Sequence, residues 1–184
     1  MGRYVIGVTG ASGAIYADRL LMHLKDLGHE THLVLTETAK KVTAFEGYPG
    51  MAVRADKVWD NQDFFAPFAS GSFRHDGMAV IPCSMGSLAK IAHGMGDSLL
   101  TRAADVCLKE RLRLVIVPRE TPMSALHLRN QAALADLGAV ILPANPAFYH
   151  KPAGLDDLAD TVLARVLDHL GVQEHAVGKR WREM

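Results

Sequence analysis

The sequence predicts an α/β fold in which helices cover both faces of a mostly parallel sheet. Apolar segments of strand length alternate with longer segments of helical pattern through most of the 184 residues. The opening stretch, Tyr4 to Ala17, passes from an apolar run through glycines and a serine into a helical pattern. Strands that are separated by helices favour a parallel sheet. The chain is also long enough to bury a full core in one domain.

In the first half of the chain, an apolar run predicts a strand over 4–9, and an amphipathic helix follows over 13–27. A second strand is predicted over 31–35, and a short helix over 37–46. The stretch 47–74 is less regular and rich in aromatic residues, so no strand or helix is predicted there.

The second half continues the alternation. Its predicted elements are a buried strand over 78–81, helices over 84–93 and 97–110, a strand over 114–117, a helix over 122–137, a strand over 139–142 and a helix over 155–170. Gly94 and Gly96 separate the two consecutive helices. No repeat or interdomain linker interrupts the pattern, so we expect residues 1–184 to form one domain, with 173–184 as a C-terminal tail. The fold class is a Rossmann-like (flavodoxin-like) three-layer sandwich.

The composition argues against several classes of protein. Twenty basic and twenty acidic residues give a formal charge of zero, so no global basicity indicates a nucleic-acid partner. The apolar runs have strand length and the N-terminus lacks signal-peptide features, so we expect no membrane association. Cys83 and Cys107 lie in apolar segments, as buried thiols in a reducing cytosol do, which predicts a cytoplasmic protein. The nine histidines show no metal-ligand spacing, and we expect no metal site.

The turn Thr9-Gly10-Ala11-Ser12-Gly13 is the most informative motif. Small residues let backbone N–H groups approach a phosphate closely, and the start of the following helix adds partial positive charge. The Ser12 hydroxyl can cap that helix or donate to a ligand. The motif therefore predicts a phosphate cradle for a nucleotide or flavin, although a simple strand-to-helix turn would have the same sequence.

The same turn resembles the start of a dinucleotide-binding dehydrogenase, but the other signals of that class are missing. Tyr16 stands where a third helix-packing glycine would help. The second strand ends in Thr36 rather than an aspartate, although Glu37 follows. No tyrosine has a lysine four residues later, so the acid/base pair of short-chain dehydrogenases is absent. We therefore do not expect a nicotinamide cofactor.

In a parallel sheet, ligands bind beyond the C-terminal ends of the strands. Most of the five predicted strand exits carry small, polar or charged residues. These exits are Thr9–Gly13, Thr36, Pro82–Ser87, Pro118–Pro122 and Pro143–Tyr149. Because so many such turns point to one edge, we expect a binding site there.

Charged residues add chemistry to that edge. Arg119 at a strand end can anchor a phosphate or a flavin carbonyl while the adjacent Glu120 handles protons. The alternative is a solvated ion pair that caps the next helix. Arg102 and Lys109 are seven residues apart, hence on one helix face, and by themselves are typical of a solvated surface.

A series of short motifs runs in order along the chain: A-S-G-S at 69–72, P-C-S-M-G-S at 82–87, R-A-A-D-V at 102–106, L-K-E-R at 108–111, V-P-R-E-T-P at 117–122 and P-A-F-Y at 146–149. Together with T-G-A-S-G, this series resembles the UbiX/Pad flavin prenyltransferases, among the FMN-binding, homo-oligomeric flavoproteins. The resemblance covers nearly the whole chain. Older names in that family describe aromatic-acid or 3-polyprenyl-4-hydroxybenzoate decarboxylases. The resemblance implies instead a transferase that makes prenylated FMN for a separate UbiD-type decarboxylase.

The resemblance also implies roles for individual residues. The implied FMN contacts are Thr9, Gly10, Ala11, Ser12, Thr36, Ser84, Met85, Gly86, Ser87 and Arg119. The implied ligands of the prenyl phosphate are Arg102, Lys109, Tyr149 and Arg165. The implied catalytic residues are Ser12, Glu46 and Glu120. The chain departs from the family pattern at Thr36, Met85 and Phe64, where we would expect serine, threonine and tryptophan. An aromatic face at Phe64 still favours an allylic cation.

The implied reaction joins N5 of reduced FMN to C1 of dimethylallyl monophosphate, releases phosphate and closes a fourth ring at flavin C6 without a metal. The implied assembly is a homododecamer that shares sites between subunits. The basic tail Lys179–Arg182 then either closes over a neighbour's ligand or is only a basic, frayed terminus. Three alternatives stay open: an FMN-dependent cysteine decarboxylase, direct decarboxylation of aromatic acids, and a carrier that only delivers flavin.

Overall fold

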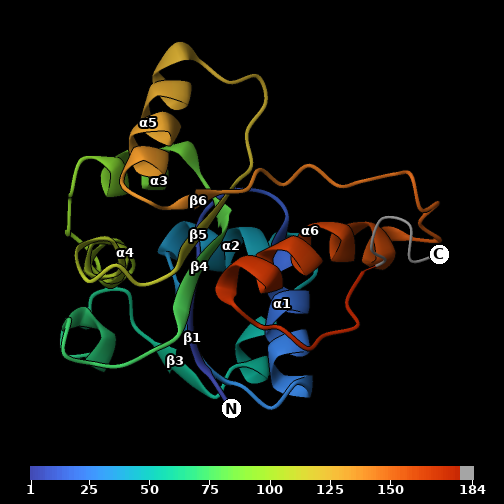
Figure 1. Cartoon of the computed structure of the whole chain (residues 1–184), viewed down its shortest axis with the longest axis horizontal. Helices are drawn as coiled ribbons and strands as arrows, with labels where there is room; N and C mark the ends of the chain where they lie inside the picture. Colours follow the sequence, from blue (N-terminus) through green and yellow to red (C-terminus); the bar gives the residue numbers. More distant parts are fainter. Residues whose placement is uncertain (179–184) are drawn as a thin grey trace.

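Six parallel strands form the centre of the molecule, a computed structural model that describes residues 1–178. The strands are β1 (Arg3–Val8), β2 (Glu30–Leu35), β3 (Lys57–Trp59), β4 (Gly77–Cys83), β5 (Leu114–Pro118) and β6 (Val140–Ile141). Their order in the sheet is β3-β2-β1-β4-β5-β6, and every neighbouring pair is parallel. The chain turns from one half of the sheet to the other between β1 and β4, which lie side by side (Figure 1).

Strand β3 is the one strand that the sequence pattern did not predict. It has three residues, lies at the sheet edge and exposes Lys57 and Val58, so it has no alternation of buried and exposed positions. Two single-turn 3-10 helices, η1 (Met51–Arg54) and η2 (Pro67–Ala69), interrupt the same stretch. Without β3 the strand order is that of flavodoxin-like sheets, and with β3 it is the Rossmann order.

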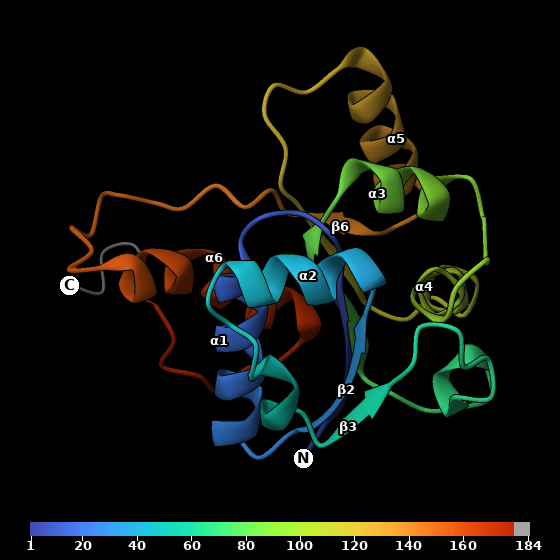
Figure 2. The ribbon, with the colours of Figure 1, turned by 180° about the vertical axis from the view of Figure 1, so that it is seen from behind.

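Helices cover both faces of the sheet, as predicted, and make it the middle of three layers (Figure 1). On one face lie α1 (Ala14–Asp26) and α6 (Leu155–Leu170), which also pack against each other. On the other face lie α3 (Met85–Ala92), α4 (Leu99–Lys109) and α5 (Ala125–Asp136). Helix α2 (Glu37–Phe45) begins just beyond the C-terminal end of β2 (Figure 2) and adds Ala39 to the core beneath α1.

The alternation of side chains along β1 explains how one sheet supports two cores. Tyr4, Ile6 and Val8 face the α1 and α6 side, whereas Val5 faces the α4 side. On the α1 side they pack against leucines of α1. On the α4 side, Phe68 from η2 is fully buried. Burial on both faces explains why the central strands are continuous apolar runs.

Where a serine caps a helix, the helix begins later than the sequence pattern predicted. Ser98 and Ser124 each accept a hydrogen bond from the third residue of the helix, so α4 begins at Leu99 and α5 at Ala125. In each case the side chain at that third position also accepts a hydrogen bond from the serine amide, which forms a capping box.

No helix within residues 1–178 has the length and apolarity needed to cross a membrane.

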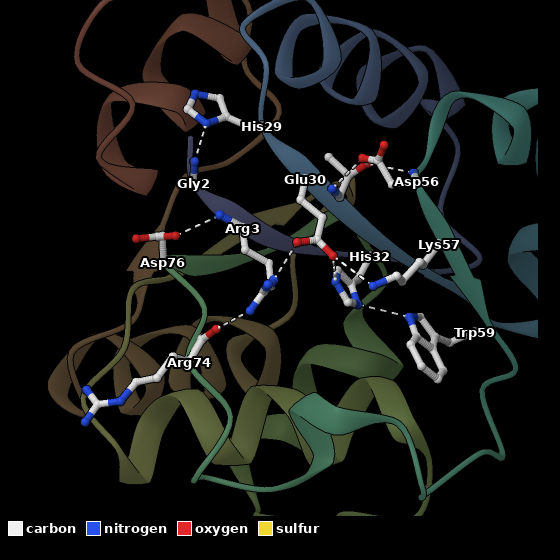
Figure 3. Close-up of polar contacts among 11 residues, drawn as sticks. Gly2, Arg3, His29, Glu30, His32, Asp56, Lys57, Trp59, Arg74 and Asp76 are labelled. Atoms are coloured by element: carbon white, nitrogen blue, oxygen red, sulfur yellow. Dashed lines mark hydrogen bonds and ion pairs between the residues drawn. The ribbon is translucent and has the colours of Figure 1, made fainter.

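At the N-terminal edge of the sheet, the Glu30 carboxylate joins three strands (Figure 3). It accepts hydrogen bonds from Arg3 (2.8 Å) on β1 and Lys57 (3.0 Å) on β3, and lies 3.0 Å from His32 Nε2. Trp59 Nε1 donates to His32 Nδ1 at 3.1 Å. The hydrogen bond from Arg3, followed by that from Lys57, lowers the pKa of Glu30 to about 2. The short edge strand β3 is thus fastened by side chains as well as by its backbone.

Candidate functional site

Hydrogen bonds join the exits of β1, β4 and β5 at the C-terminal edge of the sheet. Thr9 Oγ1 donates to the Pro82 carbonyl at 2.9 Å and accepts from the Ser84 amide at 2.7 Å. The Arg119 amide donates to the Cys83 carbonyl at 3.1 Å, and Arg119 Nε donates to the Ser12 carbonyl at 3.2 Å. The edge lies where the sheet changes direction between β1 and β4, the usual location of a ligand crevice in such sheets.

The N-terminus of α1 holds an internal anion. Gly13 precedes the helix with a φ of 111°, a left-handed conformation that favours glycine. The Glu46 carboxylate accepts hydrogen bonds from the Gly13 amide (3.1 and 3.0 Å to its two oxygens) and from the Ala14 amide (2.7 Å). These are first-turn amides of the kind that the sequence motif predicts for phosphate. In this structure they bind a carboxylate from the end of α2.

The same contacts determine the ionisation of Glu46. Burial by itself would raise its pKa, but hydrogen bonds from Ser12, Ala14 and Gly13, together with the charge of Arg119, outweigh burial and lower the pKa below its usual value. The carboxylate is therefore ionised at neutral pH. It can accept a proton or a hydrogen bond from the Ser12 hydroxyl, but it carries no proton to donate.

The turn at Gly10 packs directly against the first turn of α2. A Cβ on Gly10 would lie 2.7 Å from Cβ of Thr38 and would overlap the Thr38 side chain. Thr36 caps α2 by accepting a hydrogen bond from the Ala39 amide at 3.1 Å. The absence of a side chain at Gly10 keeps the β1 and β2 exits close together.

At the exit of β4, two serines arrange the start of α3. Ser84 Oγ accepts from the Ser87 amide (3.3 Å) and donates to Ser87 Oγ (3.1 Å). The Met85 side chain is buried in the core, so a ligand at this turn would meet its backbone. A Cβ on Gly86 would meet no atom within 4 Å, so this position faces open space. The edge thus combines hydroxyls, first-turn amides and one guanidinium, a donor set that fits the phosphate and carbonyl oxygens of FMN.

Arg119 and Glu120 separate into different roles. Arg119 is half-buried and bridges to the β1 exit, while Glu120 Oε1 accepts from the Thr121 amide at 3.0 Å. Within residues 1–178 neither side chain forms an ion pair, and α5 is capped by Ser124 instead. The alternative of an ion pair that caps the next helix therefore does not describe this structure.

The four residues predicted to hold the prenyl phosphate do not meet within one copy of the chain. Arg102 and Lys109 lie on α4, and Arg165 lies on α6, which covers the opposite face of the sheet (Figure 1). Tyr149 lies in the segment between β6 and α6, half exposed. Arg165 binds Asp168 at 2.6 Å.

Arg102 and Lys109 do share one face of α4, as their spacing predicts. Arg102 Nε donates to the Ala69 carbonyl at 3.1 Å. Lys109 pairs with Glu110, and its Nζ would lie 2.7 Å from a Cβ on Gly71. The A-S-G-S segment therefore crosses α4 next to both cations.

A cavity of about 320 Å³ lies beside Ser12 and Glu46. Its other walls include Tyr16, Tyr48 and Leu155, which sequence reasoning did not assign to the site. A larger cavity of about 480 Å³, between α1 and α6, includes none of the predicted site residues. Among residues 1–178, no group of three or more His, Cys, Asp or Glu side chains is arranged to hold a metal ion.

Comparison with known proteins identifies the family of this chain. The family model described as Flavoprotein matches residues 2–167. The flavin prenyltransferase UbiX of Thermoplasma acidophilum is 46% identical over 182 residues, which are 97% of this chain and 99% of that protein.

Two solved structures share nearly the whole fold. AnUbiX (PadA1), in complex with FMN and dimethylallyl pyrophosphate, has a TM-score of 0.96 and 44% identity, with 100% of this chain and 98% of that chain covered. The dodecameric FMN-dependent UbiX-like decarboxylase from Escherichia coli O157:H7 has a TM-score of 0.94 and 46% identity, with 98% and 99% covered. The chain belongs to the flavoprotein family and, within it, to the UbiX flavin prenyltransferases.

Proposed function

We propose that this chain transfers a dimethylallyl group from dimethylallyl monophosphate to N5 and C6 of reduced FMN, forming prenylated FMN. The observation that carries the proposal is the full-length similarity to flavin prenyltransferases, one of which was solved with FMN and an allylic pyrophosphate. When bound, reduced FMN supplies the nucleophile that displaces phosphate from the allylic carbon. The remaining steps are carried by this chain's own residues.

The C-terminal edge of the sheet, where β1 and β4 end, is the proposed FMN site. The proposed contacts at this edge are Gly10, Ala11, Ser12, Thr36, Ser84, Met85, Gly86, Ser87 and Arg119. Hydroxyls and amides at the starts of α2 and α3 suit phosphate and ribityl oxygens, and the Arg119 guanidinium suits a flavin carbonyl. We infer that residues 1–184 form one FMN-binding domain of a cytoplasmic protein.

Catalysis is assigned to three residues with different roles. Glu46 is held ionised, so we assign it the role of an acceptor that orients the Ser12 hydroxyl. The Ser12 hydroxyl would in turn transfer protons to and from N5 of the bound flavin. Glu120, at the exit of β5, is assigned as the second proton-handling group. Its described hydrogen bond, from the Thr121 amide, uses only Oε1, so Oε2 is available to exchange a proton with the ligand.

The four residues proposed to hold the prenyl phosphate, here called the phosphate clamp, require more than one copy of the chain. Since α4 and α6 cover opposite faces of the sheet, we propose that Arg102 and Lys109 of one copy join Tyr149 and Arg165 of another. The three cations of this set would stabilise the negative charge that develops on the departing phosphate. The E. coli relative is dodecameric, and we propose the same assembly here. The tail Lys179–Arg182 lies outside the described residues.

The alternatives predict different products. A cysteine decarboxylase or an aromatic-acid decarboxylase would release CO₂, and a carrier would return FMN unchanged. We propose a UbiD-type decarboxylase as the recipient of the product. Incubating the purified protein with reduced FMN and either dimethylallyl monophosphate or the pyrophosphate, without oxygen, tests the proposal. Catalytic formation of flavin that is heavier by one C5 unit supports the proposal. Unchanged FMN contradicts it, and so does CO₂ release in a parallel incubation with an aromatic acid or a cysteine substrate.

A further inference from the structure

Thr9 lies at the end of β1 and is almost completely buried, with 1% of its surface exposed. Its hydroxyl donates to the Pro82 carbonyl (2.9 Å) and accepts from the Ser84 amide (2.7 Å). The Thr9 amide also donates to the Pro82 carbonyl, at 3.2 Å. A hydroxyl has one proton to donate, so the Thr9 side chain has none left for a ligand.

These bonds stand where the regular pairing of two strands stops. The backbone register between β1 and β4 runs from Tyr4 opposite Gly77 to Gly7 opposite Val80. On the other side of β4, the register with β5 shifts between Val80 and Cys83. Beyond Val80, the backbone contributes the bond from the Thr9 amide to the Pro82 carbonyl, and the Thr9 side chain adds two further cross-strand bonds.

From the geometry we infer that Thr9 is a positioning residue for flavin binding. Its side chain fixes the Ser84–Ser87 turn, and this role replaces the direct FMN contact that the family resemblance implies for Thr9. The bonds form one continuous chain, from Thr9 Oγ1 to the Ser84 amide and from Ser84 Oγ to the Ser87 amide and hydroxyl. The inference rests on the proposed function only in taking this turn to contact FMN.

Replacing Thr9 by valine keeps the shape of the side chain and removes the hydroxyl. The Pro82 carbonyl would keep the Thr9 amide as a donor, but the Ser84 amide would lose its acceptor, and the turn would shift to find another one. A turn that is displaced in the free protein must be restored when the ligand binds, so the cost falls on FMN affinity.

Thr31 provides a matched control at the opposite edge of the sheet. It is also fully buried on a parallel strand, and its hydroxyl donates to Asp56 Oδ2 (3.1 Å) and accepts from the Asp56 amide (3.2 Å). Figure 3 shows Asp56 at this edge, next to the Glu30 network. Thr31→Val therefore removes an equivalent pair of hydrogen bonds far from the proposed flavin site.

The test measures the FMN dissociation constant and the melting temperature of Thr9→Val, Thr9→Ser and Thr31→Val. We expect Thr9→Val to weaken FMN binding about tenfold, equivalent to about 1.4 kcal/mol, and Thr9→Ser to bind like the wild type. Thr31→Val should lower the melting temperature but keep the wild-type affinity for FMN.

Wild-type affinity in Thr9→Val would overturn the inference, and so would an equal loss of affinity in Thr31→Val, since both outcomes reduce Thr9 to a structural role. If Thr9→Val does not fold, hydrogen exchange of the wild-type protein decides instead. The Ser84 amide should exchange slowly, and fast exchange would overturn the inference. A wild-type protein that binds no FMN would contradict the proposed function rather than the role of Thr9.

Discussion

Replacing Glu46 with glutamine tests whether the α1 N-terminus is built around an internal carboxylate. Both oxygens of Glu46 accept from the Gly13 amide, and one accepts from the Ala14 amide at 2.7 Å. Glutamine keeps one of these acceptors, but it replaces the other with an NH₂ group that faces N–H donors. The substitution also removes a negative charge from the positive end of the helix dipole.

Two effects contribute to the expected loss of stability. Removing a charge from a helix N-terminus costs about 0.3–1 kcal/mol at an exposed site and up to about 2 kcal/mol at a partly buried one. Exchanging charge-assisted hydrogen bonds for neutral or mismatched ones adds about 1 kcal/mol. The combined loss is therefore about 2 kcal/mol, which lowers the melting temperature of a chain of this size by about 4–8 °C.

The pH dependence separates this explanation from a general packing defect. Because the folded protein lowers the pKa of Glu46, its carboxylate contributes stability above the usual glutamate pKa, and this contribution is lost as the pH falls through the folded pKa. Thermal unfolding should therefore show a clear difference between wild type and Glu46→Gln at neutral pH and a smaller one in acid. Glu37→Gln, which removes an exposed charge from the first turn of α2, is the control and should cost no more than about 0.3–1 kcal/mol. Equal melting temperatures at neutral pH, or a difference that is unchanged in acid, would refute the reasoning.

Three further predictions concern other parts of the molecule. Glu120→Gln should bind FMN like the wild type but turn over slowly, because it keeps the shape and loses the proton-handling group; full activity would remove its assigned role. Burial lowers the pKa of His32 in the folded protein. As the pH falls below about 6.5, the unfolded chain therefore binds a proton on this histidine more readily than the folded chain does, and the free energy of unfolding decreases. Urea unfolding should therefore show that the free energy of unfolding decreases less between about pH 7.5 and about pH 5.5 in His32→Gln than in wild type. An identical decrease in both proteins would contradict this. Arg111, two residues beyond the end of α4, has a φ of 58°, so Arg111→Gly should raise stability by about 1 kcal/mol in thermal unfolding, and a decrease would argue against backbone strain there.

Much of the fold could be predicted because local patterns and burial agree. The central strands are buried on both faces and read as apolar runs, so β1 and β4 were predicted from their side chains alone. Strand β3 lacks that signal, since its pairing depends on β2 and on the Glu30 network rather than on its own three residues. The sequence pattern therefore predicted the sheet without its edge.

The candidate site could be predicted only in part. The strand exits that carry Ser12, Ser84 and Arg119 are adjacent because parallel strands end at one edge, and this adjacency follows from the fold class. The Glu46 cap could not be foreseen from spacing, because its contacts join residues more than thirty positions apart. The clamp residues on α4 and α6 lie on opposite faces, so their proposed meeting depends on contacts between copies, which no pattern within one chain encodes.

The mass of the flavin released after reaction tests the central claim most directly. The purified protein would be incubated without oxygen with reduced FMN and dimethylallyl monophosphate, and the flavin would then be released and weighed by mass spectrometry. A flavin prenyltransferase yields FMN heavier by one C5 prenyl unit, in amounts exceeding the protein. Unmodified FMN, recovered from folded protein that has bound the reduced flavin, would contradict the proposed function.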